Sequence, residues 1–235
     1  MSPRLRLEGD MRLVYDRIAL ALHAVTIIVA CLSSEFIETF SGRCLLAMEG
    51  VALLFHIWYV LPAGRGVFGT PRASKWFEYG ISATLGTIAV LHVGLEPRWE
   101  WIILFGLIGN AQQLIGLYID TERFAITPFI VGALIQLAEF IFVGQQNDGV
   151  VFWVYVAFYS LFGVHAWVVG HASASLTEVS NDHAEEVYSL FGFVAKLAVF
   201  YAEFAHFYEV EDGYIMISAV FVFILTVILT SFPFE

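Results

Sequence analysis

The chain contains 235 residues, of which 59% are hydrophobic and only 14% are charged. Soluble domains are roughly 45–50% apolar and about 25% charged, so this composition argues against a water-soluble enzyme. The net charge of −11 argues against a nucleic-acid partner, because nucleic-acid binding requires a basic surface. Two cysteines are too few for a disulfide-stapled secreted protein. The composition therefore predicts an integral membrane protein without enzymatic activity.

Eight apolar runs of about 20 residues, the length of a helix that crosses a bilayer, follow one another along the chain. They lack the period-two alternation of barrel strands, which predicts α-helices and an all-α membrane protein. We expect the first run to be a retained helix, because no small-residue cleavage site follows it. The runs cover residues 13–33, 44–62, 75–93, 101–119, 126–143, 150–170, 184–208 and 214–232.

The connections between the runs average about nine residues once about 20 residues cross the membrane in each run, which leaves no room for a second domain. We expect a helical bundle over residues 1–208, and an acidic connection with a C-terminal hydrophobic segment over residues 209–235. The eighth run is long enough to span the membrane. It could also lie in the membrane interface or pack along the bundle.

Lysine and arginine are unevenly distributed between the two ends of the predicted helices. The side that carries the N-terminus has eight of these residues, and the other side has only Arg43 and Arg98. Because cytoplasmic loops are enriched in Lys and Arg, the N-terminus is expected in the cytoplasm. The eight residues are Arg4, Arg6, Arg12, Arg17, Arg65, Arg72, Lys75 and Arg123.

The remaining basic residue, Lys196, lies near the middle of the seventh run. A charged lysine at mid-bilayer costs at least about 3 kcal/mol on insertion scales. One interpretation is a structural ion pair in a membrane scaffold. The other is an amine that forms a Schiff base, because desolvation favours carbonyl chemistry at a lysine. Retinal is a membrane-embedded aldehyde suited to such a lysine.

Glu78 is the leading candidate for the partner of this positive charge. It lies about one turn inside the third run, with Tyr79 next to it and Ser82 on the same helix face, so that both could donate hydrogen bonds to its carboxylate. The alternative is an interfacial glutamate that pairs with Lys75 or Arg72.

Several motifs of the chain resemble those of the heliorhodopsins, a retinal-binding family whose membrane orientation is inverted relative to other microbial rhodopsins. The resemblance covers roughly residues 4–208, and it agrees with the orientation that the basic residues indicate. The motifs are Glu186-Val-Tyr188 with Phe193-Val-Ala-Lys196, Trp76-Phe-Glu78-Tyr79 with Ser82-Ala, Leu22-His23-Ala-Val, Phe55-His56, Phe105-Gly-Leu-Ile-Gly-Asn110-Ala, and Trp167.

The resemblance implies a seven-transmembrane-helix rhodopsin bundle, a homodimer, and a light-sensing photoreceptor with a slow photocycle. It implies that Lys196 carries all-trans retinal as a protonated Schiff base, with Glu78 as the counter-ion. It also implies that His23 and His56 belong to a polar, water-filled cavity on the cytoplasmic side of this group. The residues expected around the chromophore are Lys196, Glu78, Tyr79, Ser82, Asn110, Gln113 and Trp167.

The chain departs from the family pattern at three places. Gly192 stands one turn before the lysine where the family has serine, Ile135-Gln136 replaces a Pro-Trp pair, and His165 replaces an asparagine. These departures affect the expected absorption maximum and photocycle more than they affect retinal binding. The hydrophobic segment 214–232 also lies outside the seven-helix pattern.

Three carboxylates inside the apolar runs suggest an alternative function, a light-activated proton-conducting channel or transporter. Glu49, Glu139 and Glu203 are expected in the extracellular half of the membrane, and His206 lies close to Glu203 in the sequence. Buried carboxylates are expensive and usually mark pathways or relays. With His23 on the cytoplasmic side, titratable groups would lie on both sides of Lys196. The alternative for the carboxylates is an interfacial or neutral structural role.

Cys31 and Cys44 fall at the outer ends of the first two runs. They could form a disulfide, but two separate buried thiols are the preferred expectation, because buried free cysteines are common in apolar cores.

Overall fold

The computed structural model describes the backbone of residues 3–61, 71–121, 126–173 and 178–231, and the side chains of residues 16–61, 74–118, 126–161, 163–164 and 190–228. Every element in this part of the chain is a helix, which confirms the all-α prediction there. Each apolar run coincides with one long helix, and a short helix, α2, was not predicted. The helices are α1 (Pro3–Leu32), α2 (Ser34–Glu38), α3 (Phe40–Val60), α4 (Pro71–Leu91), α5 (Trp99–Thr121), α6 (Ile126–Gln146), α7 (Val150–Ser173), α8 (Glu178–Phe207) and α9 (Asp212–Ser231).

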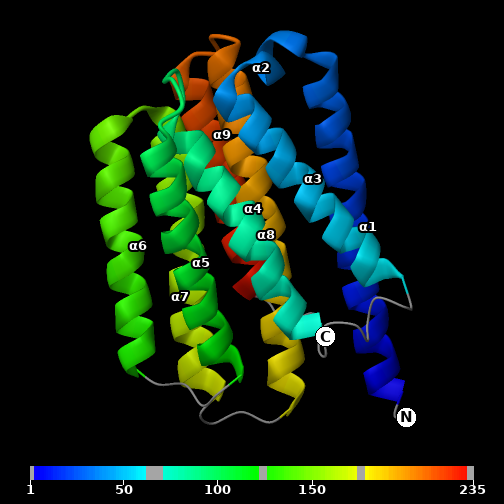
Figure 1. Cartoon of the computed structure of the whole chain (residues 1–235). Helices are drawn as coiled ribbons and strands as arrows, with labels where there is room; N and C mark the ends of the chain where they lie inside the picture. Colours follow the sequence, from blue (N-terminus) through cyan, green and yellow to red (C-terminus); the bar gives the residue numbers. More distant parts are fainter. Residues whose placement is uncertain (1–2, 62–70, 122–125, 174–177, 232–235) are drawn as a thin grey trace.

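The long helices stand side by side and alternate in direction, so that α1, α4, α6 and α8 run one way and α3, α5, α7 and α9 run back (Figure 1). The start of α1 lies at the same end of the bundle as the ends of α3, α5 and α7, and α2 lies at the opposite end. Helix α8 packs on α1, α3, α4, α7 and α9, and α4 packs on α3, α5, α6, α7 and α8, so these two helices are central in the bundle. Lys196 and Glu78 therefore sit on two central helices that pack on each other.

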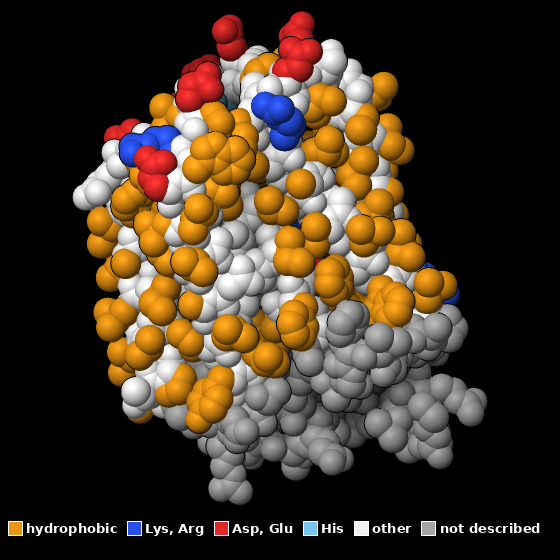
Figure 2. Space-filling model, in the orientation of Figure 1, with side chains coloured by type: hydrophobic (Ala, Val, Ile, Leu, Met, Phe, Trp, Pro, Cys, Tyr) orange, Lys and Arg blue, Asp and Glu red, His pale blue; other side chains and the backbone are white. Residues whose placement is uncertain are grey.

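The outer surface of the bundle is apolar, as a membrane-embedded protein requires. Four helical stretches in the described part of the chain are long and apolar enough to cross a membrane: Phe40–Val60, Trp99–Tyr118, Ile126–Gln146 and Leu190–Phe207. Hydrophobic side chains cover much of the face shown in Figure 2, and acidic and basic side chains gather at one end of it. Soluble monomers rarely expose apolar patches of this extent. The protein is an all-helical, membrane-embedded bundle.

The unpredicted helix α2 closes the corner between α1 and α3. The Thr39 side chain caps α3 by accepting a hydrogen bond from the Gly42 backbone N–H at 2.9 Å. A side chain at Gly42 would collide with the Phe36 carbonyl, so the tight corner requires glycine there. The Phe36 ring is fully buried and meets three rings of α8 edge to face, with centroid distances of 5.1–5.7 Å: Phe200, Phe204 and Phe207. Helix α2 thus fixes one end of α8.

Helix α9 forms a tight hairpin with α8. Glu209 adopts a left-handed conformation (φ 57°), its N–H donates to the His206 carbonyl, and the Val210 N–H donates to the Ala205 carbonyl, both at 3.0 Å. This pair of hydrogen bonds is the Schellman motif that ends many helices. The reversed chain lets α9 pack on α7 and α8. The C-terminal segment therefore packs along the bundle.

Candidate functional site: a buried lysine at a cavity

Lys196 of α8 and Glu78 of α4 form an ion pair inside the bundle. The Lys196 Nζ donates to Glu78 Oε1, and the two side chains are only 3% and 2% exposed. Both helices run in the same direction, and the two residues lie 11 and 13 residues before the ends of their helices, so they reach the same depth. Removing one partner of such a buried pair typically costs about 3–5 kcal/mol, because the other charge is left uncompensated.

The hydroxyl that donates to Glu78 is that of Tyr59 in α3, with an O–O distance of 3.3 Å. Sequence reasoning missed Tyr59, because one tyrosine in an apolar run carries no distinguishing pattern. The expected donor Ser82 is fully buried, but its Oγ has no hydrogen-bond partner, so this expectation was wrong. Tyr79 instead contacts the lysine, whose Nζ lies 4.8 Å from the centroid of the Tyr79 ring. The ring face stabilises a cation there.

Gly192, one turn before Lys196, makes room for the Tyr79 ring. A Cβ atom at Gly192 would lie 2.8 Å from Cζ and 2.9 Å from Cε1 of Tyr79, which is closer than real Cβ contacts. The absence of a side chain at position 192 therefore has a steric reason in this chain. It allows the Tyr79 ring to lie against α8 beside the lysine.

His23 and His56 form a second polar group on α1 and α3. Their rings stack with centroids 5.3 Å apart. His23 Nδ1 pairs with Glu49 Oε2 at 2.5 Å, and His56 Nδ1 lies 3.4 Å from Asp16 Oδ1. All four side chains are buried. The structure therefore brings together two histidines and two carboxylates, which we call the histidine cluster.

The position of Glu49 corrects the sequence interpretation, which separated it from His23 on opposite sides of Lys196. His23 lies nine residues before the end of α1, and Glu49 lies nine residues after the start of α3. Because the two helices are antiparallel neighbours, equal separations from their shared end give equal depth. The helix α3 also begins at Phe40, four residues before the predicted start, which moves Glu49 about 6 Å deeper.

Tyr59 connects the histidine cluster to the ion pair. The edge of its ring faces His56, with centroids 5.6 Å apart, while its hydroxyl donates to Glu78. A continuous polar column therefore runs from Asp16 to Lys196 through the core.

A cavity of about 310 Å³ opens beside Lys196. This volume is at the lower end of the roughly 300–1,000 Å³ range of small-molecule sites. Glycines on four helices contribute to its wall, and a Cβ at Gly116 would collide with the Trp76 ring, so flat groups can approach the backbone closely. The lining residues include Lys196, Gly192, Trp76, Tyr79, Ala83, Thr84, Gly109, Gln113, Gly116, Phe129, Gly132, Tyr159 and Gly163.

Only some of the residues expected around the chromophore line the cavity. Gln113 lines the cavity, and its Oε1 atom is buried without a hydrogen-bond partner. Asn110 is not among the residues that line the cavity: its side chain is exposed and donates to the Gly106 carbonyl at 2.7 Å. The Trp167 side chain lies outside the described residues, as does that of His165.

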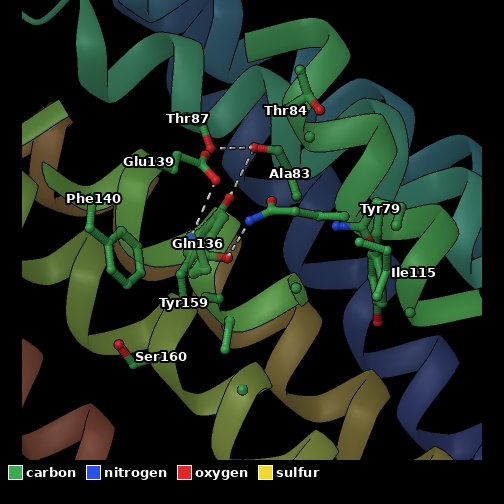
Figure 3. Close-up of a pocket in the computed structure, with 18 of the residues that line it drawn as sticks. Tyr79, Ala83, Thr84, Thr87, Ile115, Gln136, Glu139, Phe140, Tyr159 and Ser160 are labelled. Carbon is green, nitrogen blue, oxygen red and sulfur yellow. Dashed lines mark hydrogen bonds between the residues drawn. The ribbon is translucent and has the colours of Figure 1, made fainter. Parts of the chain in front are cut away.

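Glu139 of α6 lies on the cavity wall, within a hydrogen-bonded network of uncharged side chains (Figure 3). The Tyr155 hydroxyl donates to Glu139 Oε1 at 2.8 Å, and the Gln136 amide donates to Oε2 at 3.4 Å. Gln112 of α5 in turn donates to Gln136 at 3.2 Å, and the Tyr155 hydroxyl lies 3.1 Å from the Thr87 hydroxyl. We call these five side chains the amide–carboxyl network. The sequence singled out Glu139 for its charge and Gln136 only as a departure from the family pattern, and it gave no indication of Gln112, Tyr155 or Thr87.

Glu203 is buried in the bundle, whereas His206 lies on its surface. The Glu203 side chain is 2% exposed, neither carboxyl oxygen has a hydrogen-bond partner, and the Ser41 hydroxyl of α3 faces it. His206 is exposed and lies 3.7 Å from Asp212, so it faces the surface of the protein and does not extend a path from Glu203. Cys31 and Cys44 are both free thiols, but only Cys44 is buried, so the expectation of a buried thiol was wrong for Cys31.

No protein-family model, curated protein or solved structure matches the chain. Within the described residues, no group of three or more His, Cys, Asp and Glu side chains is placed to hold a metal ion. The distinctive chemistry of the described core is therefore a buried lysine, paired with a carboxylate, at the wall of a cavity of ligand size.

Proposed function

We propose that the protein is a retinal-binding, light-sensing membrane photoreceptor of the heliorhodopsin type. In this proposal α1 and α3–α8 are the seven helices of a rhodopsin bundle, and α9 is an additional membrane helix. The N-terminus lies in the cytoplasm, and two copies form a homodimer. The observation that carries the proposal is the contact of the Lys196–Glu78 pair with a ligand-sized cavity.

The residues present fit a polyene aldehyde. The Lys196 amine lines the cavity, and aromatic and glycine residues supply the apolar walls that suit a flat conjugated chain. The Lys196 amine would hold the aldehyde carbon through a C=N bond, and the carbonyl oxygen would be released as water. Glu78 holds the positive charge of the protonated nitrogen, and Tyr59 orients Glu78. Bound retinal supplies light absorption and isomerisation.

A purely structural ion pair is the main competing interpretation, and the cavity favours ligand binding over it. A structural pair is stabilised by close packing around both charges, because voids forfeit contacts. Here one face of the lysine instead opens toward about 310 Å³ of space that also meets four other helices. A lysine that only neutralises Glu78 has no need of this space.

The polar column favours a second candidate function, light-driven proton conduction. The histidine cluster and Tyr59 give the Lys196–Glu78 pair a series of titratable neighbours in the core. Glu203, seven residues after Lys196 on the same helix face and about 10.5 Å further along the axis, is a buried carboxyl in the half of the bundle near α2. Such groups on both sides of the lysine are what a proton path requires.

Expression with all-trans retinal, followed by visible spectroscopy, tests the proposed function. The chain has two lysines, so Lys196→Ala should abolish a visible band and Lys75→Ala should preserve it. Borohydride reduction followed by peptide mass mapping should place the retinyl group on Lys196. A wild-type protein that folds in membranes without forming a pigment, or a pigment that survives Lys196→Ala, would contradict the proposal.

A further inference from the structure

The cavity has two chemically different ends. One end meets the Lys196 amine on α8, and the other meets the amide–carboxyl network on α5 and α6, where Gln112, Gln136 and Glu139 line the wall. In Figure 3 Tyr79, the neighbour of Lys196, lies well apart from Gln136 and Glu139. An entirely hydrocarbon ligand would match only the walls between these ends.

The separation of the ends can be followed along α4, which lines the cavity throughout. Tyr79 contacts the lysine, and Thr87 belongs to the amide–carboxyl network. Eight residues separate them, which corresponds to about 12 Å along a helix. Helices α6 and α8 both pack on α4 and α7, and all four helices contribute residues to the cavity wall, so a molecule bonded to Lys196 of α8 can extend through the cavity toward Glu139 of α6.

At the polar end of the cavity, some hydrogen-bond donors are not used by the bonds within the amide–carboxyl network. Each glutamine amide has two N–H donors, and the structure uses one at Gln112 and one at Gln136 within the network. The Thr84 hydroxyl also lines the cavity, is 8% exposed, and has no hydrogen-bond partner. Leaving a buried donor or acceptor unpaired against an apolar group costs about 1–3 kcal/mol.

We propose that the cavity selects a polyene aldehyde that carries an oxygen substituent, a hydroxyl or a ketone, at the end remote from the aldehyde. This inference rests on the proposed function and specifies its ligand. The free amide donors of Gln112 and Gln136 bind the substituent oxygen, and Glu139 accepts a hydrogen bond from a hydroxyl substituent. Lys196 bonds to the aldehyde carbon with release of water, as it does with unsubstituted retinal.

The test compares three aldehydes on the retinal-free protein in membranes: all-trans retinal, its 3-hydroxy derivative and its 4-oxo derivative. The oxygenated aldehydes should form pigment at roughly three- to tenfold lower concentration, the factor that one further buried hydrogen bond contributes. The corresponding alcohols form no bond with Lys196, so their quenching of tryptophan fluorescence measures cavity binding separately. Trp76 lines the cavity, so its fluorescence reports binding there. The oxygenated alcohols should therefore bind at lower concentration than unsubstituted retinol.

Gln136→Leu should remove the preference and still form pigment with unsubstituted retinal. Gln145→Leu is the matched control, because Gln145 is exposed on the same helix and does not line the cavity. If Gln136→Leu does not accumulate in membranes, the test rests on the wild-type protein alone, through the concentrations at which the three aldehydes form pigment.

The outcomes separate the two proposals. Equal binding of all three aldehydes and alcohols by the wild-type protein would overturn the ligand preference and leave the photoreceptor function intact. Failure of every aldehyde to form a Lys196-dependent pigment would overturn the proposed function itself.

Discussion

Tyr59 is hydrogen-bonded to Glu78 across 3.3 Å, and the edge of the same ring lies against the histidine cluster. The phenol therefore couples the partner of Lys196 to the rest of the polar column. A hydrogen bond to a charged acceptor is stronger than one between neutral groups, so Tyr59 both orients the carboxylate and spreads its negative charge. The relationship leads to two opposite spectral predictions for the proposed pigment.

Glu78→Gln should shift the visible band to longer wavelength. The substitution removes the negative charge that stabilises the positive nitrogen, and a buried charge without its partner is strongly destabilised. Absorption spectra of the wild-type protein and the variant check this prediction. Glu100→Gln, at an exposed position paired with Arg98, should leave the spectrum unchanged. An unshifted band in Glu78→Gln would mean that another carboxylate is the counter-ion.

Tyr59→Phe should shift the band in the opposite direction, to shorter wavelength, and by less. Without the phenol hydroxyl the Glu78 negative charge is more concentrated beside the lysine, which stabilises the positive nitrogen in the ground state. Spectra recorded beside Tyr214→Phe provide the control, because Tyr214 is 66% exposed on α9. A red shift in Tyr59→Phe would contradict the orienting role of this hydroxyl.

Gly192→Ala should destabilise the protein by about 1–3 kcal/mol, the usual effect of overpacking a core. The new Cβ would overlap the buried Tyr79 ring, which would have to shift from its place beside the lysine. Gly50→Ala is the matched control in the interior of α3, where a Cβ would meet nothing within 4 Å. It should stabilise the protein by about 0.5–1 kcal/mol, because alanine is the better helix former. Thermal unfolding of both variants measures the difference, and equal midpoints would contradict the steric account.

Glu203→Gln should leave the visible pigment intact and suppress any light-dependent proton current. Glutamine keeps the size of the buried side chain but removes its exchangeable proton. Voltage-clamp recordings of wild type, Glu203→Gln and the exposed variant Glu209→Gln check this prediction. A wild-type protein without photocurrent at any voltage would refute conduction and leave the sensor function. An undiminished current in Glu203→Gln would show that the path does not include this residue.

The long helices were predictable because each needs only a continuous apolar run of the right length. Helix α2 was not, since five residues are too few to produce such a run. Its stability comes from tertiary packing of Phe36 against α8, which is not encoded in local sequence. Helix starts were also less predictable than helix existence, as α3 shows.

The candidate site was predictable where charge alone identifies a residue. Lys196 and Glu78 stand out because charged side chains are costly in a membrane, and the structure places them in contact. Tyr59 and Gln136 are ordinary residues in apolar helices, and only the packing of the helices gives them partners. The pairing of His23 with Glu49 was not predictable, because their equal depth depends on α3 beginning at Phe40, four residues before the predicted start.

The Phe36 contact gives α8 a mechanical property. The three phenylalanines that surround Phe36 end at Phe207, 11 residues or about 16 Å beyond Lys196. Because this packing holds one end of α8, we expect a displacement at Lys196 to tilt the helix about that end more than it slides it. The tilt would be felt by α1, α3 and α9, on which α8 packs.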